Sequence, residues 1–166
     1  FVVSSNAYAA DFKVSPSGGT FGIGKTFSVD LKINTFGESI NAAQGKLQFD
    51  PNTLEVKSIS KEGSIFNFWL QEPTFSNDTG VIEFIGGTPS GVSGSSLQVI
   101  SIAFSAKALG TSDLVFINAS ITASDGSGTN ISGNATGASF SVSSSGGGAL
   151  PGVIAKPAPE PVPVPT

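Results

Sequence analysis

Strict alternation of apolar and polar residues over short segments is the feature that most restricts how this chain can fold. Residues 26–34 read TFSVDLKIN, which places an apolar residue at every second position from Phe27 to Ile33. Successive side chains of a β-strand point to opposite faces, whereas an amphipathic helix repeats its apolar residues every three or four positions. This segment therefore predicts a strand with one face in a core and the other in solvent.

The same alternation recurs along the chain between Gly-, Pro-, Asn- and Asp-rich breaks. Residues 44–49 place Leu47 and Phe49 on one face and three polar side chains on the other. Further alternating segments cover residues 53–59, 80–85, 96–106, 113–122 and 135–142. No window shows a sustained apolar stripe at helical spacing. Several short strands separated by turns predict an all-β sandwich or barrel.

Missing residue types remove most catalytic chemistry. The chain has no cysteine, so it has neither a thiolate nucleophile nor a thiolate zinc site. It has no histidine either, and therefore lacks the commonest general base. A serine nucleophile would then need a lysine base, and no Ser-x-x-Lys stands at a helix start. An acid–base pair would need carboxylates at a fixed separation, and the strand and loop segments that carry the candidates do not fix one. These candidate acids, interpreted as surface residues, are Glu62, Glu72, Asp78 and Glu83. We therefore expect that the chain is not an enzyme.

The charged residues argue against two further classes of target. All eight cationic residues are lysines, scattered from Lys13 to Lys156, and the net charge is −4. Nucleic-acid binding needs a concentrated basic surface, so we expect no nucleic-acid partner. No apolar run approaches the roughly 18 residues that span a bilayer, so we expect no membrane insertion within this segment.

The two ends of the chain differ from its middle. The start reads FVVSSNAYAAD, with Ala7 and Ala9 placed as in an A-x-A cleavage site, so residues 1–9 are predicted to be the end of a signal peptide. This implies a secreted, extracellular or cell-surface protein. Residues 143–148 (SSSGGG) and 156–166 (KPAPEPVPVPT) are typical of flexible and extended linkers. We therefore expect a domain over residues 10–142 and a disordered Gly/Ser-rich then Pro-rich linker over residues 143–166.

Two other segments carry candidate site residues. In residues 65–70 (IFNFWL), period two places Phe66, Phe68 and Leu70 on one face, interpreted as core, and Trp69 on the other. We expect Trp69 to pack, with exposure as a carbohydrate-binding ring as the alternative. Residues 124–134 (SDGSGTNISGN) resemble a calcium loop in their oxygen-rich side chains but contain one carboxylate, Asp125. Calcium sites concentrate more negative ligands, so we expect no metal there.

A turn motif in the middle of the chain introduces a family resemblance. Residues 49–56 read FDPNTLEV, in which Asp50 is expected to accept backbone N–H groups two residues on while Pro51 fixes a turn. An aromatic residue followed by Asp-Pro and then Leu-x-Val is similar to the corresponding block of cohesin domains. The segments FSVDLKIN (27–34), GVIEFIGG (80–87) and SLQVISIAFSAKAL (96–109) extend the resemblance over most of residues 11–142. It implies a single jelly-roll β-sandwich of roughly nine strands.

The resemblance also implies a function and a site. A cohesin recognises a dockerin-like module in a calcium-dependent way, with the calcium carried by the dockerin, so we expect no cofactor in this chain. The partner lies across one sheet face that includes the strand before the Asp-Pro turn. The corresponding outward residues here are Ala42, Gln44, Lys46, Gln48, Val81, Glu83 and Ile85. The best-studied cohesins present Asn and Asp where this chain has Ala42 and Gln44.

Two alternatives to dockerin recognition stay open at this point. One is a carbohydrate-binding module that contacts polysaccharide through Trp69, since a polysaccharide-degrading context fits cohesins and sugar-binding sandwiches alike. The other is a structural stalk domain at the cell surface, for which an extended Pro-rich linker is equally suited. An exposed aromatic ring in a groove favours the first, and a flat face with few aromatic rings favours a protein partner.

Overall fold

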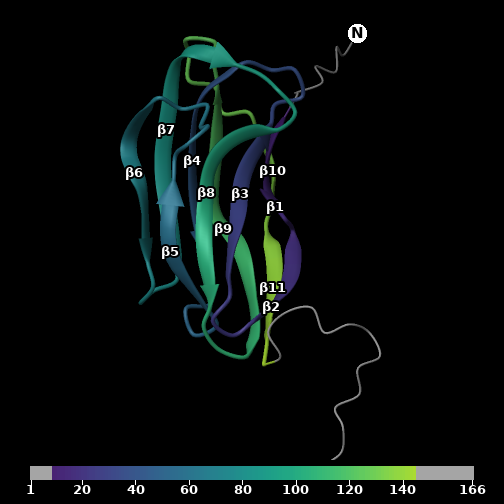
Figure 1. Ribbon diagram of the computed structural model, residues 1–166. Helices are drawn as coiled ribbons and strands as arrows, with labels where there is room; N and C mark the ends of the chain where they lie inside the picture. The colour runs from purple at the N-terminus through teal and green to yellow at the C-terminus, as the bar shows by residue number, and fades with distance from the viewer. Residues whose placement is uncertain (1–8, 145–166) are drawn as a thin grey trace, which may run out of the picture.

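A computed structural model describes residues 9–144 as two β-sheets packed face to face (Figure 1). The described part of the chain contains eleven strands and no helix, so it has no helix able to cross a membrane. The predicted all-β sandwich is confirmed. The proposed signal-peptide end up to residue 8 and the linker from residue 145 onward lie outside the described residues.

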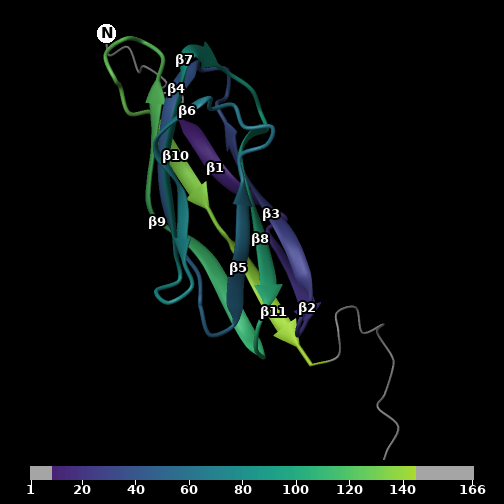
Figure 2. The same cartoon turned by 60° about the vertical axis from the view of Figure 1, so that its left-hand side comes forward.

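The first sheet has five strands in the order β10-β1-β3-β8-β5. Their bounds are Ser132–Thr136, Ala10–Ser15, Thr26–Asn34, Leu97–Ala106 and Leu54–Ser60. The second sheet has six strands in the order β2-β11-β9-β4-β7-β6. Their bounds are Gly18–Gly22, Ala138–Ser143, Gly110–Ala123, Ile40–Gln48, Val81–Val92 and Phe68–Ser76. Figure 2 shows the two layers from the side, with β3, β8 and β5 in one and β4 and β9 in the other.

The terminal strands cross from one sheet to the other. β1 pairs with β10 in the first sheet, β2 pairs with β11 in the second, and both pairings are parallel. The crossing between β10 and β11 occurs at Gly137, where a Cβ would overlap the carbonyl of Leu114. The expected count of about nine strands is too low because each terminal stretch divides into two short strands, one in each sheet.

The interior consists of the inward residues of both sheets. Val29, Leu31 and Ile33 on β3 and Leu47 and the following Phe49 are fully buried or nearly so, as the alternation predicted. At one end of the core, Phe27 stacks on Phe21 with ring centroids 3.9 Å apart and lies close to Phe104 and Phe140. No buried side-chain nitrogen or oxygen in the described part lacks a hydrogen-bond partner, so the packing of the sandwich has no polar defect.

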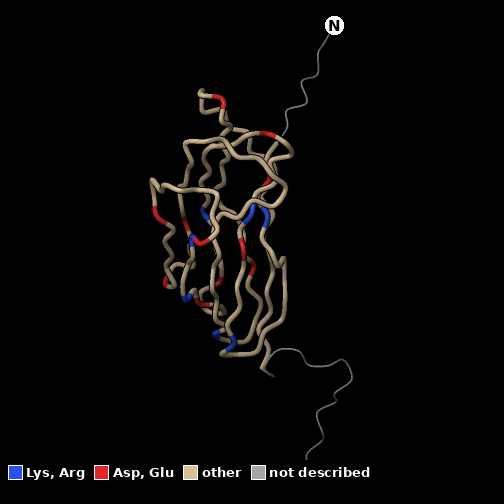
Figure 3. The backbone as a smooth tube through the Cα atoms, turned by 45° about the horizontal axis from the view of Figure 1, so that its top comes forward, with Lys and Arg blue, Asp and Glu red and all other residues tan. Residues whose placement is uncertain are grey.

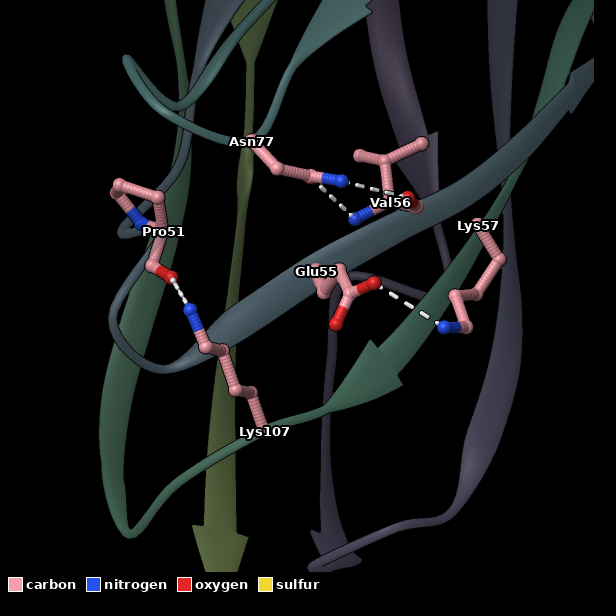
Figure 4. A network of polar contacts seen from close by, with 6 residues as sticks. All are labelled: Pro51, Glu55, Val56, Lys57, Asn77 and Lys107. Atoms are coloured by element: carbon pink, nitrogen blue, oxygen red, sulfur yellow. Dashed lines mark hydrogen bonds and ion pairs between the residues drawn. The ribbon is translucent and has the colours of Figure 1, made fainter.

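Asp50 forms the predicted turn between β4 and β5. Its carboxylate accepts the backbone N–H of Asn52 and the hydroxyl of Thr53, both at 2.9 Å. These two hydrogen bonds, the Asn52 N–H first, hold the pKa of Asp50 below its ordinary value because they stabilise the charged form. Next to the turn, the Lys107 ammonium donates to the Pro51 carbonyl at 3.1 Å (Figure 4). Asp50 is thus a turn-forming residue, as expected.

Asn77 ties the two sheets together at the edge formed by β5 and β6. Its side-chain oxygen accepts the Val56 N–H at 2.8 Å, and its side-chain nitrogen donates to the Val56 carbonyl at 3.0 Å (Figure 4). The amide therefore pairs with β5 as a backbone neighbour would, and it does so from the turn between β6 and β7 in the opposite sheet. One side-chain amide thus provides hydrogen-bond partners for the N–H and C=O groups of Val56 on the open edge of β5.

Gly45 on β4 provides a test of how tightly the interior is packed. A Cβ at this position would lie 2.7 Å from the ring of Phe84, which is fully buried on neighbouring β7. We expect Gly45→Ala to lower the free energy of unfolding by about 1–3 kcal/mol, because the ring has no space into which to move. Urea unfolding followed by circular dichroism measures this change.

Gly87→Ala is the matched control for this variant. Its Cβ would meet the ring of Phe68, but that ring is 45% exposed and is free to turn toward solvent. We therefore expect a clearly smaller loss of stability than for Gly45→Ala. Equal losses in the two variants would contradict the packing explanation and indicate a backbone effect common to both glycines.

Asp50 predicts a component of stability that depends on pH. Because folding lowers the pKa of Asp50 below its ordinary value of 3.8, the charged carboxylate stabilises the fold above that value, and the contribution disappears as the pH falls through the lowered pKa. We expect Asp50→Asn to be less stable than the wild type at neutral pH and nearly equal to it at the acid end. Urea unfolding at both pH values measures the difference, with Asp113→Asn as the control because Asp113 is an exposed residue outside any turn of this kind.

Candidate binding face

The outer faces of the two sheets differ in the side chains that they present to solvent. Among the described residues, the large apolar side chains that are well exposed are Ile23, Phe36, Phe68, Leu70, Phe75, Leu109, Val115 and Ile117. Five of them belong to β6 and β9, and none belongs to a strand of the five-stranded sheet. Of these five, Phe75 stands opposite the buried Ile82 and so lies on the inward side of the edge strand β6, which leaves four for the outer face. Exposed apolar side chains gathered over one sheet indicate an interaction surface more than scattered ones do.

The seven outward residues predicted from the sequence lie together on this six-stranded sheet. β4 and β7 are antiparallel neighbours, and Gln44 stands opposite Ile85, Lys46 opposite Glu83 and Gln48 opposite Val81. Residues directly opposite each other share a face of the sheet. Ala42, the last of the outward residues on β4, stands opposite Gly87. We call the outer surface of β9, β4, β7 and β6 the central face; that it binds a partner stays a prediction.

The middle of the central face is an ion pair with no net charge. The Lys46 ammonium lies 3.8 Å from the Glu83 carboxylate, and both side chains are partly exposed. Asn118 on β9 and Thr74 on β6 flank this pair in the same row. Two shallow hollows adjoin it, one toward Gln44 and Ile85 and the other toward Phe75 and Val81. Elsewhere among the described residues, lysines and acidic residues are interspersed without a large cluster of one sign (Figure 3).

A bulge in β9 adds apolar residues that the alternation did not predict. Lys46 pairs with Asn118 and Leu47 with Phe116, so Ile117 is an extra residue between them. Such a bulge turns two consecutive side chains toward the same face. Ile117 is 50% exposed, and Val115, opposite Gln48, is 44% exposed. The sequence does carry a signal for the bulge. The inward residues are even-numbered up to Phe116 and odd-numbered from Ala119 onward.

The aromatic segment 65–70 does not have the phase predicted from its sequence. Phe68 and Leu70 were expected in the core, but they are 45% and 79% exposed. Phe66 is buried as expected, yet it precedes β6 and does not share its phase. The reason lies in the neighbouring strand, because Trp69 pairs with Gly86, where the absence of a side chain leaves room for the indole. Phe68 then pairs with Gly87, and its ring lies across that glycine on the central face.

Trp69 packs against the edge of the core instead of standing in solvent. Its ring meets Phe66 and Phe84 edge-on, with centroids 5.9 and 6.3 Å away, and it is half-buried. The Lys61 ammonium lies over the Trp69 ring, 5.8 Å from its centroid. The same ammonium also pairs with the Glu72 carboxylate. A sugar platform needs a broad, accessible ring face. The packing of Trp69 against the core leaves little of such a face.

The oxygen-rich loop between β9 and β10 uses its carboxylate for its own folding. This loop projects from one end of the sandwich (Figure 2). The carboxylate of Asp125 accepts the Thr129 hydroxyl and the Ser127 N–H, the latter at 2.9 Å, and these bonds lower the pKa of Asp125. Across residues 9–144, no group of three or more acidic side chains is placed to hold a metal ion.

Of the four acids considered for catalysis, Glu72 and Glu83 each pair with a lysine.

Comparisons with known proteins agree with this architecture. The family model of the cohesin domain matches residues 12–142. No curated protein matches the sequence. Among solved structures, a type I cohesin–dockerin complex from Clostridium thermocellum contains a chain that is 15% identical with a TM-score of 0.68, the alignment covering 81% of this chain and 94% of that one.

Two further solved structures show the same fold. The seventh ScaB type I cohesin from Pseudobacteroides cellulosolvens is 21% identical with a TM-score of 0.68, covering 82% of this chain and 93% of that one. A non-cellulosomal cohesin from the archaeon Archaeoglobus fulgidus is 17% identical with a TM-score of 0.64, covering 81% and 91%. These likenesses confirm the predicted jelly-roll sandwich, and the family match over most of its length shows that the chain belongs to the cohesin family.

Proposed function

We propose that this chain is a non-catalytic receptor domain that binds a dockerin-like protein module through the central face. The observation that carries the proposal is the gathering of exposed apolar side chains from β6 and β9 around a neutral polar centre. An interface of this kind combines apolar anchors with a few polar groups that set the orientation of the partner. Cohesins are protein-interaction modules, and one of the similar structures is a cohesin–dockerin complex.

The central face is suited to a folded protein more than to a sugar. Phe68 and Leu70 stand at one side and Val115 and Ile117 at the other, with Lys46 and Glu83 between them. Adjacent strands lie about 4.8 Å apart, so the two apolar groups are roughly 14 Å apart across the sheet. They are also offset along the strands, because Phe68 is in the row of Ala42 and Val115 is in the row of Gln48. A helix of the partner, about 10 Å wide, contacts both groups when it crosses the face diagonally. The half-buried position of Trp69 weighs against the carbohydrate-binding alternative.

The setting of this interaction is also part of the proposal. We place the domain outside the cell or on its surface, in an assembly that can serve polysaccharide breakdown, because of the signal-peptide pattern and the low charge of the sequence. Calcium enters through the partner, since the described residues offer no cluster of acidic ligands. Any calcium dependence of binding therefore reports the folding of the partner.

Capture experiments test the proposed partner. The full chain, immobilised, is exposed to the secreted and surface proteins of its source organism, with calcium and with a chelator. We expect capture of a small calcium-loop protein that is lost in the chelator. Retention on an insoluble polysaccharide, abolished by Trp69→Ala and without any captured protein, would instead establish the carbohydrate-binding alternative.

Substitutions of the exposed apolar residues test the central face itself. We expect Leu70→Ser and Ile117→Ser each to weaken binding of the captured partner about tenfold, because each removes an apolar contact of the size of an interface anchor. Titration calorimetry with the purified partner measures the effect. Leu109→Ser is the matched control, since the exposure of Leu109, 60%, lies between those of Leu70 and Ile117 but the residue is in the turn between β8 and β9.

The control distinguishes the central face from general surface effects. All three leucine and isoleucine positions are exposed, so the variants should unfold at nearly the same urea concentration as the wild type. A loss of binding in Leu109→Ser that equals the loss in Leu70→Ser and Ile117→Ser would show that the partner uses another surface.

A further inference from the structure

The polar centre of the central face is complementary to itself. Lys46 and Glu83 stand directly opposite each other on β4 and β7, so they occupy one row on either side of the line between these strands. A two-fold axis along that line, parallel to the strands, places β4 of one copy over β7 of a second copy. Lys46 of each copy then faces Glu83 of the other, which gives two ion pairs of opposite charge across the contact.

The other rows of the central face are compatible with the same arrangement. The axis also brings Gln48 over Val81 and Gln44 over Ile85 of the second copy, and it brings the small pair Ala42 and Gly87 together. No row sets like charges against each other. β9 comes to lie over β6 of the second copy, where Val115 faces Ser76, Asn118 faces Thr74 and Thr122 faces Phe68. Sheets packed in this way keep their strands within about 30° of each other.

From this complementarity we infer that the central face pairs with a second copy of this chain when no other partner covers it. The inference uses the same surface as the proposed function, but it does not depend on the identity of the partner. Because both contacts cover Lys46 and Glu83, self-pairing and partner binding exclude each other. The free face is then available only in the monomer.

The size of the face sets the strength of this pairing. Four strands about 4.8 Å apart and seven rows about 3.4 Å apart give a flat area of roughly 450 Å² per copy, or about 900 Å² for the pair. Stable interfaces bury about 1,200–2,000 Å² in total. The contact is therefore a weak and reversible one that forms only at high protein concentration. A partner of ordinary affinity displaces the second copy readily.

Sedimentation of the full chain at increasing concentration tests the inference. The wild type is expected to associate to dimers in the upper micromolar range. Lys46→Glu and Glu83→Lys are each expected to weaken the dimer about tenfold, because each variant sets two pairs of like charges against each other across the contact. Lys13→Glu changes the net charge of the chain by the same amount as Lys46→Glu, but Lys13 lies on β1 in the other sheet and its variant should associate as the wild type does.

Mixing the two charge variants separates pairing from any effect on folding. An equal mixture of Lys46→Glu and Glu83→Lys restores opposite charges at both contacts, so the mixture should associate as strongly as the wild type while each variant alone does not. Circular dichroism establishes that both variants are folded. A wild type that stays monomeric at millimolar concentration, or a mixture no stronger than its components, would falsify the inference. Neither result affects the capture experiment, which uses dilute protein.

Discussion

The packing of aromatic rings onto glycines in the two central strands determines much of this structure. Gly45 leaves room for Phe84 in the interior, Gly86 for Trp69 at the edge of the core, and Gly87 for Phe68 on the outer side. A side chain at any of these positions would overlap a ring in its present place. Because Trp69 faces inward over Gly86, Phe68 is forced onto the opposite side of β6, where it becomes part of the central face. One pair of adjacent glycines thus connects the core to the candidate binding surface.

The sequence predicted best those strands that have one buried face and one exposed face. β3 and β4 lie inside their sheets, so burial alone sets their phase, and the inward positions of Leu31 and Leu47 followed from alternation. The same reasoning placed Gln44, Lys46 and Glu83 on outward positions. That β4 and β7 are neighbours followed from the family resemblance, because pairing between distant segments leaves no local pattern in a sequence.

Other parts of the fold could not be predicted from local sequence patterns, because contacts between distant parts of the chain determine them. β6 is an edge strand with two register shifts, so the pairing of Trp69 with Gly86 outweighs the local alternation and turns Phe68 and Leu70, which were expected in the core, outward. In β9, the bulge at Ile117 changes the phase within a single strand. The terminal segments divide between the two sheets because Gly137 allows a close crossing past Leu114, a contact between distant parts of the chain. The apolar edges of the central face were missed for these reasons.

The parallel pairing of the terminal strands has a mechanical consequence. β1 and β2 lead in from one end of the described chain, β11 leads out at the other, and the two ends lie at opposite poles of the sandwich (Figure 1). A force that pulls Ala9 and Ser144 apart slides β1 along β10 and β2 along β11. The hydrogen bonds of each pair then carry the load together and do not open one after another. A domain built in this way resists tension along its chain, and β4, β7 and β6 of the central face are not paired with the loaded strands.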